Sequence, residues 1–186
     1  MALRRDDEHW NVLAIAARGE TGKALALLAE VGRFRTGGFP QVLLGRVERP
    51  EGKGDLLAGI GPLAQGDQRC QGILDRLIPM EETLSFPHDD VTETLCECFE
   101  PLAERLCGKT FYVRSHLRGL KGRLEHPAVE RALGEFLFEF AAKAGAVPKV
   151  SFSDPDVIVV VEVVGRRVGY AFLGREERAL PLIRVR

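Results

Sequence analysis

The sequence predicts an α+β fold of two domains, residues 1–85 and residues 86–186. Short apolar runs of strand length alternate with segments in which apolar residues recur every three or four positions, the spacing of a helix buried on one face. This patterning breaks at residues 85–88. The charge also changes sign along the chain: residues 1–104 contain 11 Lys and Arg against 18 Asp and Glu, and residues 105–186 contain 15 against 9.

The first series of patterned segments predicts two short helices among three strands. In chain order these are a strand over residues 11–17, a helix over 21–32, a strand over 41–47, a helix over 56–63 and a strand over 73–80. Thr21 is the expected cap of the first helix, and Gly32 is its expected end. Pro79 indicates that the last strand ends there or lies at a sheet edge.

The second series predicts helix, helix, strand, helix, strand, strand. Its segments are residues 90–106 (divided in two at Pro101), 110–117, 127–145, 156–164 and 168–173, with a last strand over 182–186. Asp90 is the expected cap of the first helix, with Glu93 completing a capping box. The predicted apolar faces of the helices are Val91, Leu95, Phe99, Leu102 and Leu106, and then Leu133, Phe136, Leu137, Phe140 and Ala144. Residues 156–164 are apolar almost throughout, which predicts a central strand covered on both faces.

Several classes of protein are disfavoured. No run of about 18 apolar residues occurs, so no membrane span is expected, and acidic residues directly after the first arginines argue against a signal peptide. The four cysteines lack the spacing of a zinc site and are expected to be reduced, mostly buried thiols in a cytoplasmic protein. Neither a dinucleotide-binding loop, a Walker loop nor a G-x-S-x-G elbow occurs. We therefore expect no metal, no cofactor and no catalytic residues.

Residues 105–124 contain six basic residues and no acidic one. They are Arg105, Lys109, Arg114, Arg118, Lys121 and Arg123. Side chains alternate across a strand, so Tyr112, Arg114 and His116 are expected to share the face opposite to Phe111 and Val113. Cations neutralise phosphates, and aromatic rings stack on unpaired bases. This pattern indicates RNA binding, but charge that protects an edge strand would look the same.

Residues 110–164 resemble a THUMP domain, an RNA-binding module of tRNA-modifying systems. The matching pieces are TFYVRSHLRG at residues 110–119, ERALGEFLFEF at 130–140 and SFSDPDVIVVVEVVG at 151–165. Upstream, the strand–helix–strand start and ILDRLIPM at residues 73–80 resemble the ferredoxin-like domain that precedes THUMP. The resemblance implies a ferredoxin-like domain followed by a THUMP domain of order α-α-β-α-β-β.

The chain most resembles the stand-alone THUMP proteins that serve as tRNA-binding adaptors of the RNA cytidine acetyltransferase. The resemblance implies a protein without catalysis that grips the acceptor stem and 3′ end of tRNA and presents it to a separate enzyme. Arg114 and Arg118 match the family's basic positions, whereas Phe152 stands where the family usually has leucine. The RNA-binding residues expected are Lys109, Tyr112, Arg114, His116, Arg118, Lys121 and Arg123. We expect replacing both Arg114 and Arg118 by alanine to weaken binding without unfolding the domain.

Two alternatives remain at this point. One is a small enzyme with a site between the two domains that uses Asp154 or His116. The other is a protein-interaction module that binds an acidic partner through the same basic face. The sequence Asp154-Pro155-Asp156 could be a catalytic pair of carboxylates, but before an apolar strand it is more typical of a turn.

Overall fold

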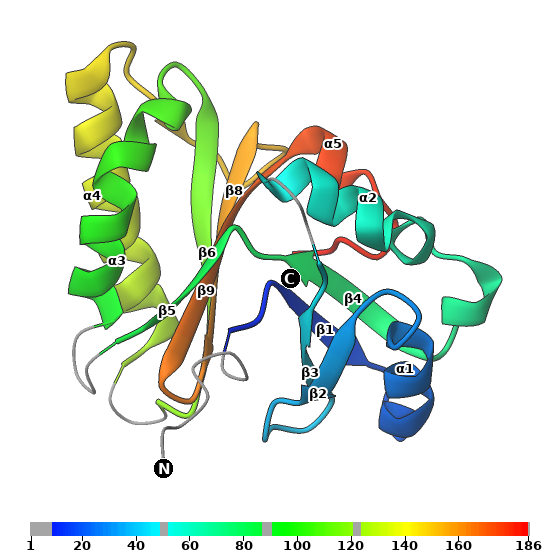
Figure 1. Cartoon of the computed structure of the whole chain (residues 1–186). Helices are drawn as coiled ribbons and strands as arrows, with labels where there is room; N and C mark the ends of the chain where they lie inside the picture. The colour runs from blue at the N-terminus through cyan, green and yellow to red at the C-terminus, as the bar shows by residue number, and fades with distance from the viewer. Residues whose placement is uncertain (1–8, 49–51, 87–90, 121–123, 186) are drawn as a thin grey trace. The chain divides into compact units, whose positions relative to one another are not determined.

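The computed structural model describes residues 9–48, 52–86, 91–120 and 124–185 (Figure 1). The chain forms two compact units: residues 1–84 with 176–184, and residues 85–175 with 185–186. Each unit has its own sheet and helices, so the protein is of mixed α and β structure with two sheets, as the α+β prediction requires. In the described parts of the chain, no helix is both long enough and apolar enough to cross a membrane.

The first unit is built on a four-stranded antiparallel sheet. Its elements are β1 (Val12–Ala16), α1 (Thr21–Leu28), β2 (Arg33–Thr36), β3 (Val42–Arg46), α2 (Gly52–Ala64), the 3-10 turn η2 (Gln68–Cys70) and β4 (Leu74–Pro79). The strand order is β2-β3-β1-β4. The central strand pairs Leu13 with Leu44 on one side and with Ile78 on the other, and all three are buried. Pro79 ends β4 at a sheet edge, which confirms the prediction from its missing N–H.

Two details of this unit differ from the sequence prediction. Strand β2 was not predicted, because its sequence RFRT has one apolar residue among exposed polar ones and no periodic signal. The ring of Phe34 lies directly against Gly45 of β3, where any side chain would collide with it. Thr21 is the first residue of α1 and not its cap: Glu20 holds the cap position and makes no side-chain capping bond.

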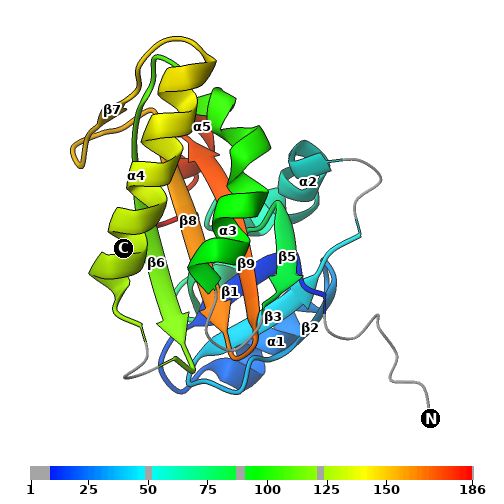
Figure 2. The ribbon, with the colours of Figure 1, turned by 90° about the vertical axis from the view of Figure 1, so that its left-hand side faces the viewer.

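The second unit contains a five-stranded sheet with helices on one face. The sheet includes β5 (Glu82–Ser85), of which only Ser85 belongs to this unit. The other elements of the unit are α3 (Val91–Phe99), the 3-10 helix η3 (Glu100–Leu106), β6 (Thr110–Arg118), α4 (His126–Ala144), β7 (Lys149–Val150), β8 (Val157–Val164) and β9 (Arg167–Gly174), and α5 (Arg175–Arg178) follows. The strand order is β5-β9-β8-β6-β7. Strand β6 runs parallel to β7 and β8, whereas β8 and β9 form the predicted antiparallel hairpin. Helices α3 and α4 lie together over one face of this sheet (Figures 1 and 2).

The first predicted helix of this unit divides at Pro101, as expected. Helix α3 ends at Phe99, and η3 continues with Pro101 in its first turn. The tighter 3-10 winding moves the buried face by one residue, because a 3-10 turn takes three residues and not 3.6. Ala103 is therefore buried where the helical pattern predicted Leu102. The predicted cap Asp90 lies outside the described residues.

Helix α4 buries a narrower face than predicted. Its buried residues are Val129, Leu133, Leu137 and Ala141. Phe136 and Phe140 are half-buried and stack on each other with ring centroids 4.4 Å apart, and Ala144 is exposed. Phe136 and Phe140 thus contact each other and are only partly covered, which is why the apolar pattern in the sequence is wider than the face that packs on the sheet.

The central strand β8 is buried at all eight positions, which confirms the prediction from its apolar run. The strand predicted over residues 182–186 is wrong. Among the described residues there, Leu182 donates its N–H to Ala64 and accepts from the N–H of Leu77, and no strand ladder follows. Two isolated hydrogen bonds fix this segment in the first unit without extending either sheet.

Candidate nucleic-acid interface

Strand β6 separates its side chains into two sets, as the period-two pattern predicted. Its odd-numbered residues, from Phe111 to Leu117, are buried, and its even-numbered residues, from Thr110 to Arg118, are half-buried. The buried set faces α4, which packs on β6. The face that carries Tyr112, Arg114, His116 and Arg118 is called the outer face of β6 below.

At one end of the outer face, Tyr112 and Arg114 lie beside an exposed ring. The ring centroids of Tyr112 and Phe152 are 5.4 Å apart, and the Arg114 guanidinium carbon is 5.7 Å from the Tyr112 centroid. Arg114 also lies 3.8 Å from a Glu130 carboxylate oxygen, at the outer limit of an ion pair. Glu130 itself accepts the N–H of Ser115 at 2.8 Å. Because the contact of Arg114 with Glu130 is at the limit of an ion pair and the Arg114 side chain is 39% exposed, Arg114 keeps donors that can turn towards a ligand.

At the other end, His116 and Arg118 both contact the carboxylate of Glu162. Glu162 lies opposite His116 on the neighbouring strand β8, and it is completely buried. Its Oε1 is 3.1 Å from His116 Nδ1, and its Oε2 accepts a hydrogen bond from Arg118 Nη1. Both side chains are less than a quarter exposed (22% and 18%). They are therefore largely engaged within the protein.

Electrostatics explains why a carboxylate can lie at this buried position. Burial by itself would raise the pKa of Glu162, because it disfavours the charged form. The contact with His116 and the charge of Arg118 outweigh burial and hold this pKa below its ordinary value. The carboxylate is thus ionised at neutral pH and holds the side chains of Arg118 and His116 in place.

The remaining predicted RNA-binding residues divide into two groups. Lys109 is exposed and directly precedes β6, and its carbonyl accepts the N–H of Lys149 on β7. Lys149 is exposed as well, so β7 adds a cation that the sequence analysis did not include. Lys121 and Arg123 lie outside the described residues. The structure therefore brings Tyr112, Arg114, His116 and Arg118 onto one face, with Lys109 at its start.

Sequence reasoning missed two residues of this site. Phe152 was noted only as a departure from the family's leucine, yet its side chain is 78% exposed beside Tyr112. Glu162 was given no role, although it is the single charged residue in an otherwise apolar buried strand. A lone acid in such a strand needs a partner, and this signal could have pointed to His116 and Arg118.

The Asp154-Pro155-Asp156 segment has a structural role. Asp154 has a positive φ of 47°, as in a tight turn. Asp156 accepts both the N–H and the hydroxyl of Thr110, while its own N–H donates to the same hydroxyl. These bonds, the backbone bond first, lower the pKa of Asp156. The turn thus fastens the start of β8 to the start of β6.

Other groups in the described residues offer less for chemistry. None of the described His, Cys, Asp and Glu residues form a cluster of three that could hold a metal ion. All four cysteines are free thiols, but only Cys70 is buried, so the prediction of mostly buried thiols is wrong. Burial raises the pKa of Cys70 and of Cys96, which makes both thiols less reactive.

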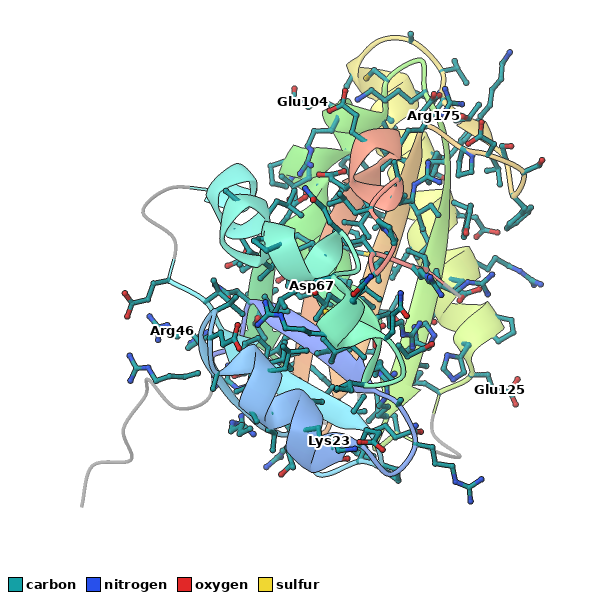
Figure 3. The ribbon with its side chains drawn as sticks, turned by 90° about the vertical axis from the view of Figure 1, so that its right-hand side faces the viewer. Lys23, Arg46, Asp67, Glu104, Glu125 and Arg175 are labelled. Carbon is teal, nitrogen blue, oxygen red and sulfur yellow. The ribbon has the colours of Figure 1, made fainter. Side chains whose placement is uncertain are left out.

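The first unit contains a cavity of about 920 Å³ along β2 and β3. Trp10 and Phe34 line it together with three arginines and three glutamates. The charged residues are Arg33, Arg35, Arg46 (labelled in Figure 3), Glu48, Glu81 and Glu82. Because the two signs balance, this cavity shows no electrostatic preference for a polyanion.

Comparison with known proteins finds likeness at the level of the fold. No family model and no curated protein matches the sequence. Among solved structures, TrmN from Thermus thermophilus has a TM-score of 0.58 at 19% identity, covering 89% of this chain and 45% of that one. A 4-thiouridine synthetase, solved as an RNA complex with bound ATP, has a TM-score of 0.53 at 15% identity, covering 88% and 41%. A protein from Listeria monocytogenes described as a predicted N6-adenine-specific DNA methylase has a TM-score of 0.53 at 10% identity, covering 89% and 40%.

These comparisons correct the functional prediction. Further similar structures are described as a methyltransferase complexed with SAH and as a methylase. Four of the similar structures are thus described as enzymes, a synthetase, a methyltransferase and two methylases, which contradicts the expectation of a non-enzymatic adaptor. The chain spans about half the length, or less, of these enzymes. The likeness to TrmN and the 4-thiouridine synthetase supports the THUMP-like fold that the sequence resemblance implied.

Proposed function

We propose that this chain takes part in enzymatic RNA modification and that it binds its RNA substrate through the outer face of β6. The observation that carries the proposal is the pair of Tyr112 and Arg114, which combines an aromatic ring with a cation at one end of the outer face, and the exposed Lys109 directly precedes this strand. Such a combination suits a phosphate backbone with accessible bases. A protein of the same fold has been solved in complex with RNA.

The substrate class that we propose is tRNA, and methyl transfer is the reaction. The names of the similar structures support methyl transfer more often than any other reaction. We also assign the first unit to the ferredoxin-like class. Its element order β-α-β-β-α-β and its antiparallel sheet order β2-β3-β1-β4 support this assignment.

A salt titration tests RNA binding. We expect the chain to bind total tRNA in filter-binding assays, with log affinity falling linearly as log salt concentration rises, because bound cations release counterions from the phosphates. Replacing Lys109 and Arg114 by alanine should weaken binding and flatten this slope. The matched control is Arg131→Ala, which removes an exposed cation from α4 on the other face of the sheet. Absence of binding at about 50 mM salt would contradict the proposal.

Nucleoside analysis tests the enzymatic part. We expect tRNA from cells that lack this protein to lose one methylated nucleoside, which wild type restores and the Lys109/Arg114 double variant does not. Purified protein should then transfer labelled methyl groups from S-adenosylmethionine to this undermethylated tRNA. An unchanged nucleoside profile, or tRNA that binds but receives no label, would rule out methyl transfer and leave RNA binding standing.

A further inference from the structure

The exposed apolar side chains of the second unit gather in one segment. Among the described residues, the large hydrophobic side chains that are exposed are Val147, Val150 and Phe152, at 59%, 55% and 78%. All three lie between α4 and β8. Phe152 is the most exposed, and in the family that the sequence resembles the same position is usually leucine. Exposed apolar side chains that gather in one segment can mark an interaction site, whereas a single exposed one is normal.

The backbone holds Phe152 in a defined position even though its ring is exposed. The N–H of the preceding Ser151 donates to the carbonyl of Phe111 at 3.0 Å, which continues the pairing of β7 with β6. The Ser151 hydroxyl donates to the carbonyl of Ser153 at 2.9 Å, bridging across Phe152. Tyr112 then supports one side of the ring, with the two planes inclined by 39°. The loop is preorganised, so a ligand that contacts the ring need not order it.

We propose that Phe152 is a stacking site for an unpaired nucleobase of the bound RNA, with Tyr112 supporting the ring and Arg114 and Lys149 contacting the flanking phosphates. This inference rests on the proposed RNA binding and adds the conformation of the bound nucleotide. A base inside an A-form helix has both faces covered by its neighbours. Only an unpaired or terminal base offers a free face to a protruding ring.

The charges around the ring favour a nucleotide over an apolar partner. Lys149 pairs in register with Thr110, and side chains in register share a face of the sheet, so Lys149 points to the same face as Tyr112. The two nearby acids, Asp154 and Asp156, both contact Arg175, at 3.5 Å and 3.2 Å. Figure 3 labels Arg175 at this end of the second unit. Arg175 offsets one of these two acids, and the charge of Lys109 also acts on Asp156, so Arg114 and Lys149 are the cations that set the potential beside the ring.

Three RNA probes with the full chain test the inference: a single-stranded oligonucleotide, a blunt duplex, and a hairpin with a single-stranded 3′ extension. Base–aromatic stacking contributes enough that Phe152→Ala should weaken binding of the single strand and of the extended hairpin by at least about fivefold. Binding of the blunt duplex should change by less than about twofold, because phosphate contacts remain. The matched control Val147→Ala should leave all three affinities unchanged.

Two more variants separate stacking from apolar contact. Phe152→Leu restores the family's residue and keeps apolar surface, so it should behave like Phe152→Ala if stacking is the interaction. Phe152→Trp should bind the single strand at least as well as wild type. Its emission should be quenched on binding, and it is separable from the buried Trp10, the only tryptophan of the natural sequence.

The possible outcomes distinguish this inference from the proposed function. If wild type binds none of the three probes at low salt, both fail. If wild type binds but Phe152→Ala changes no affinity, or weakens duplex and single strand equally, the stacking site alone is overturned. Thermal unfolding should show the same midpoint for Phe152→Ala and wild type, because the side chain is 78% exposed.

Discussion

The two ends of the outer face of β6 carry the same kinds of side chain but differ in what their charges meet. Tyr112 and Arg114 lie beside the exposed ring of Phe152, and the carboxylate of Glu130 is 3.8 Å from Arg114, at the limit of an ion pair. His116 and Arg118 contact the fully buried Glu162. A strand with one repeating pattern thus has an end available for binding and an end used for stability.

This difference teaches that a count of basic residues along the chain overstates the charge offered to a ligand. The run from residue 105 to 124 contains no acid, but Glu162 reaches it from the neighbouring strand. Four predictions, in order of decreasing effect, test whether the two ends differ as described.

Replacing Arg118 by alanine should have the largest effect. Removing one partner of a buried ion pair typically lowers the free energy of unfolding by about 3–5 kcal/mol, and because His116 still contacts Glu162 we expect a loss near the lower end of this range. Urea unfolding measures this change. The matched variant Arg114→Ala, at the end beside Phe152, should lower the free energy of unfolding by less than about 1 kcal/mol. Equal losses of unfolding free energy in the two variants would show that the two ends of the strand do not differ.

The same contrast corrects an expectation from the sequence. The double replacement of Arg114 and Arg118 by alanine was expected to weaken RNA binding without unfolding the domain. With Arg118 bound to a buried carboxylate, that double variant should be strongly destabilised, and any loss of RNA binding would be uninterpretable. Arg114 and Lys109 are the residues to replace when binding is tested.

Replacing Glu162 by glutamine should have a smaller effect than Arg118→Ala. Glutamine keeps the shape and an acceptor oxygen but loses the charge, so the buried position no longer holds an uncompensated charge. Hydrogen bonds to charged groups contribute about 1.5–3 kcal/mol, which is the destabilisation expected. Glu48→Gln is the control, since its contact with Arg33 joins two side chains that are both nearly fully exposed. A Glu162→Gln protein as stable as wild type would show that the contacts of His116 and Arg118 with Glu162 do not stabilise the fold.

Replacing Arg114 by alanine should reduce RNA binding without affecting the fold. Loss of a single phosphate contact should lower the slope of log affinity against log salt by about 1 and weaken binding similarly for different RNA sequences. Salt titration of wild type, Arg114→Ala and Arg131→Ala measures this. A slope equal to that of wild type would mean that Arg114 does not contact a phosphate.

The smallest effect is expected in acid. The pKa of Glu162 is lower in the folded state than its ordinary value of 4.5. A group with a depressed folded pKa stabilises the protein above its unfolded pKa and loses this contribution as pH falls through the folded pKa. The stability difference between wild type and Glu162→Gln should therefore be constant above about pH 5 and shrink below pH 4.5. A difference independent of pH would show that the carboxylate is not the group responsible.

The sequence by itself determined most of the elements and both faces of β6. Period two in residues 110–118 requires that Phe111 and Val113 be buried together, and the apolar run of β8 requires a central strand. Pro101 and Pro79 marked a helix break and a strand at the sheet edge, because proline lacks an N–H. Strand β2 could not be predicted, because an exposed edge strand does not require alternating apolar residues.

Only the tertiary structure decided which cations remain available for binding. Glu162 is 44 residues from Arg118 in sequence, and the parallel pairing of β6 with β8 brings the two together. The turn at residues 151–153 likewise places Phe152 on Tyr112 from 40 residues away along the chain. Charge and stacking act over a few ångströms, so their outcome depends on strand register, which a single sequence does not specify.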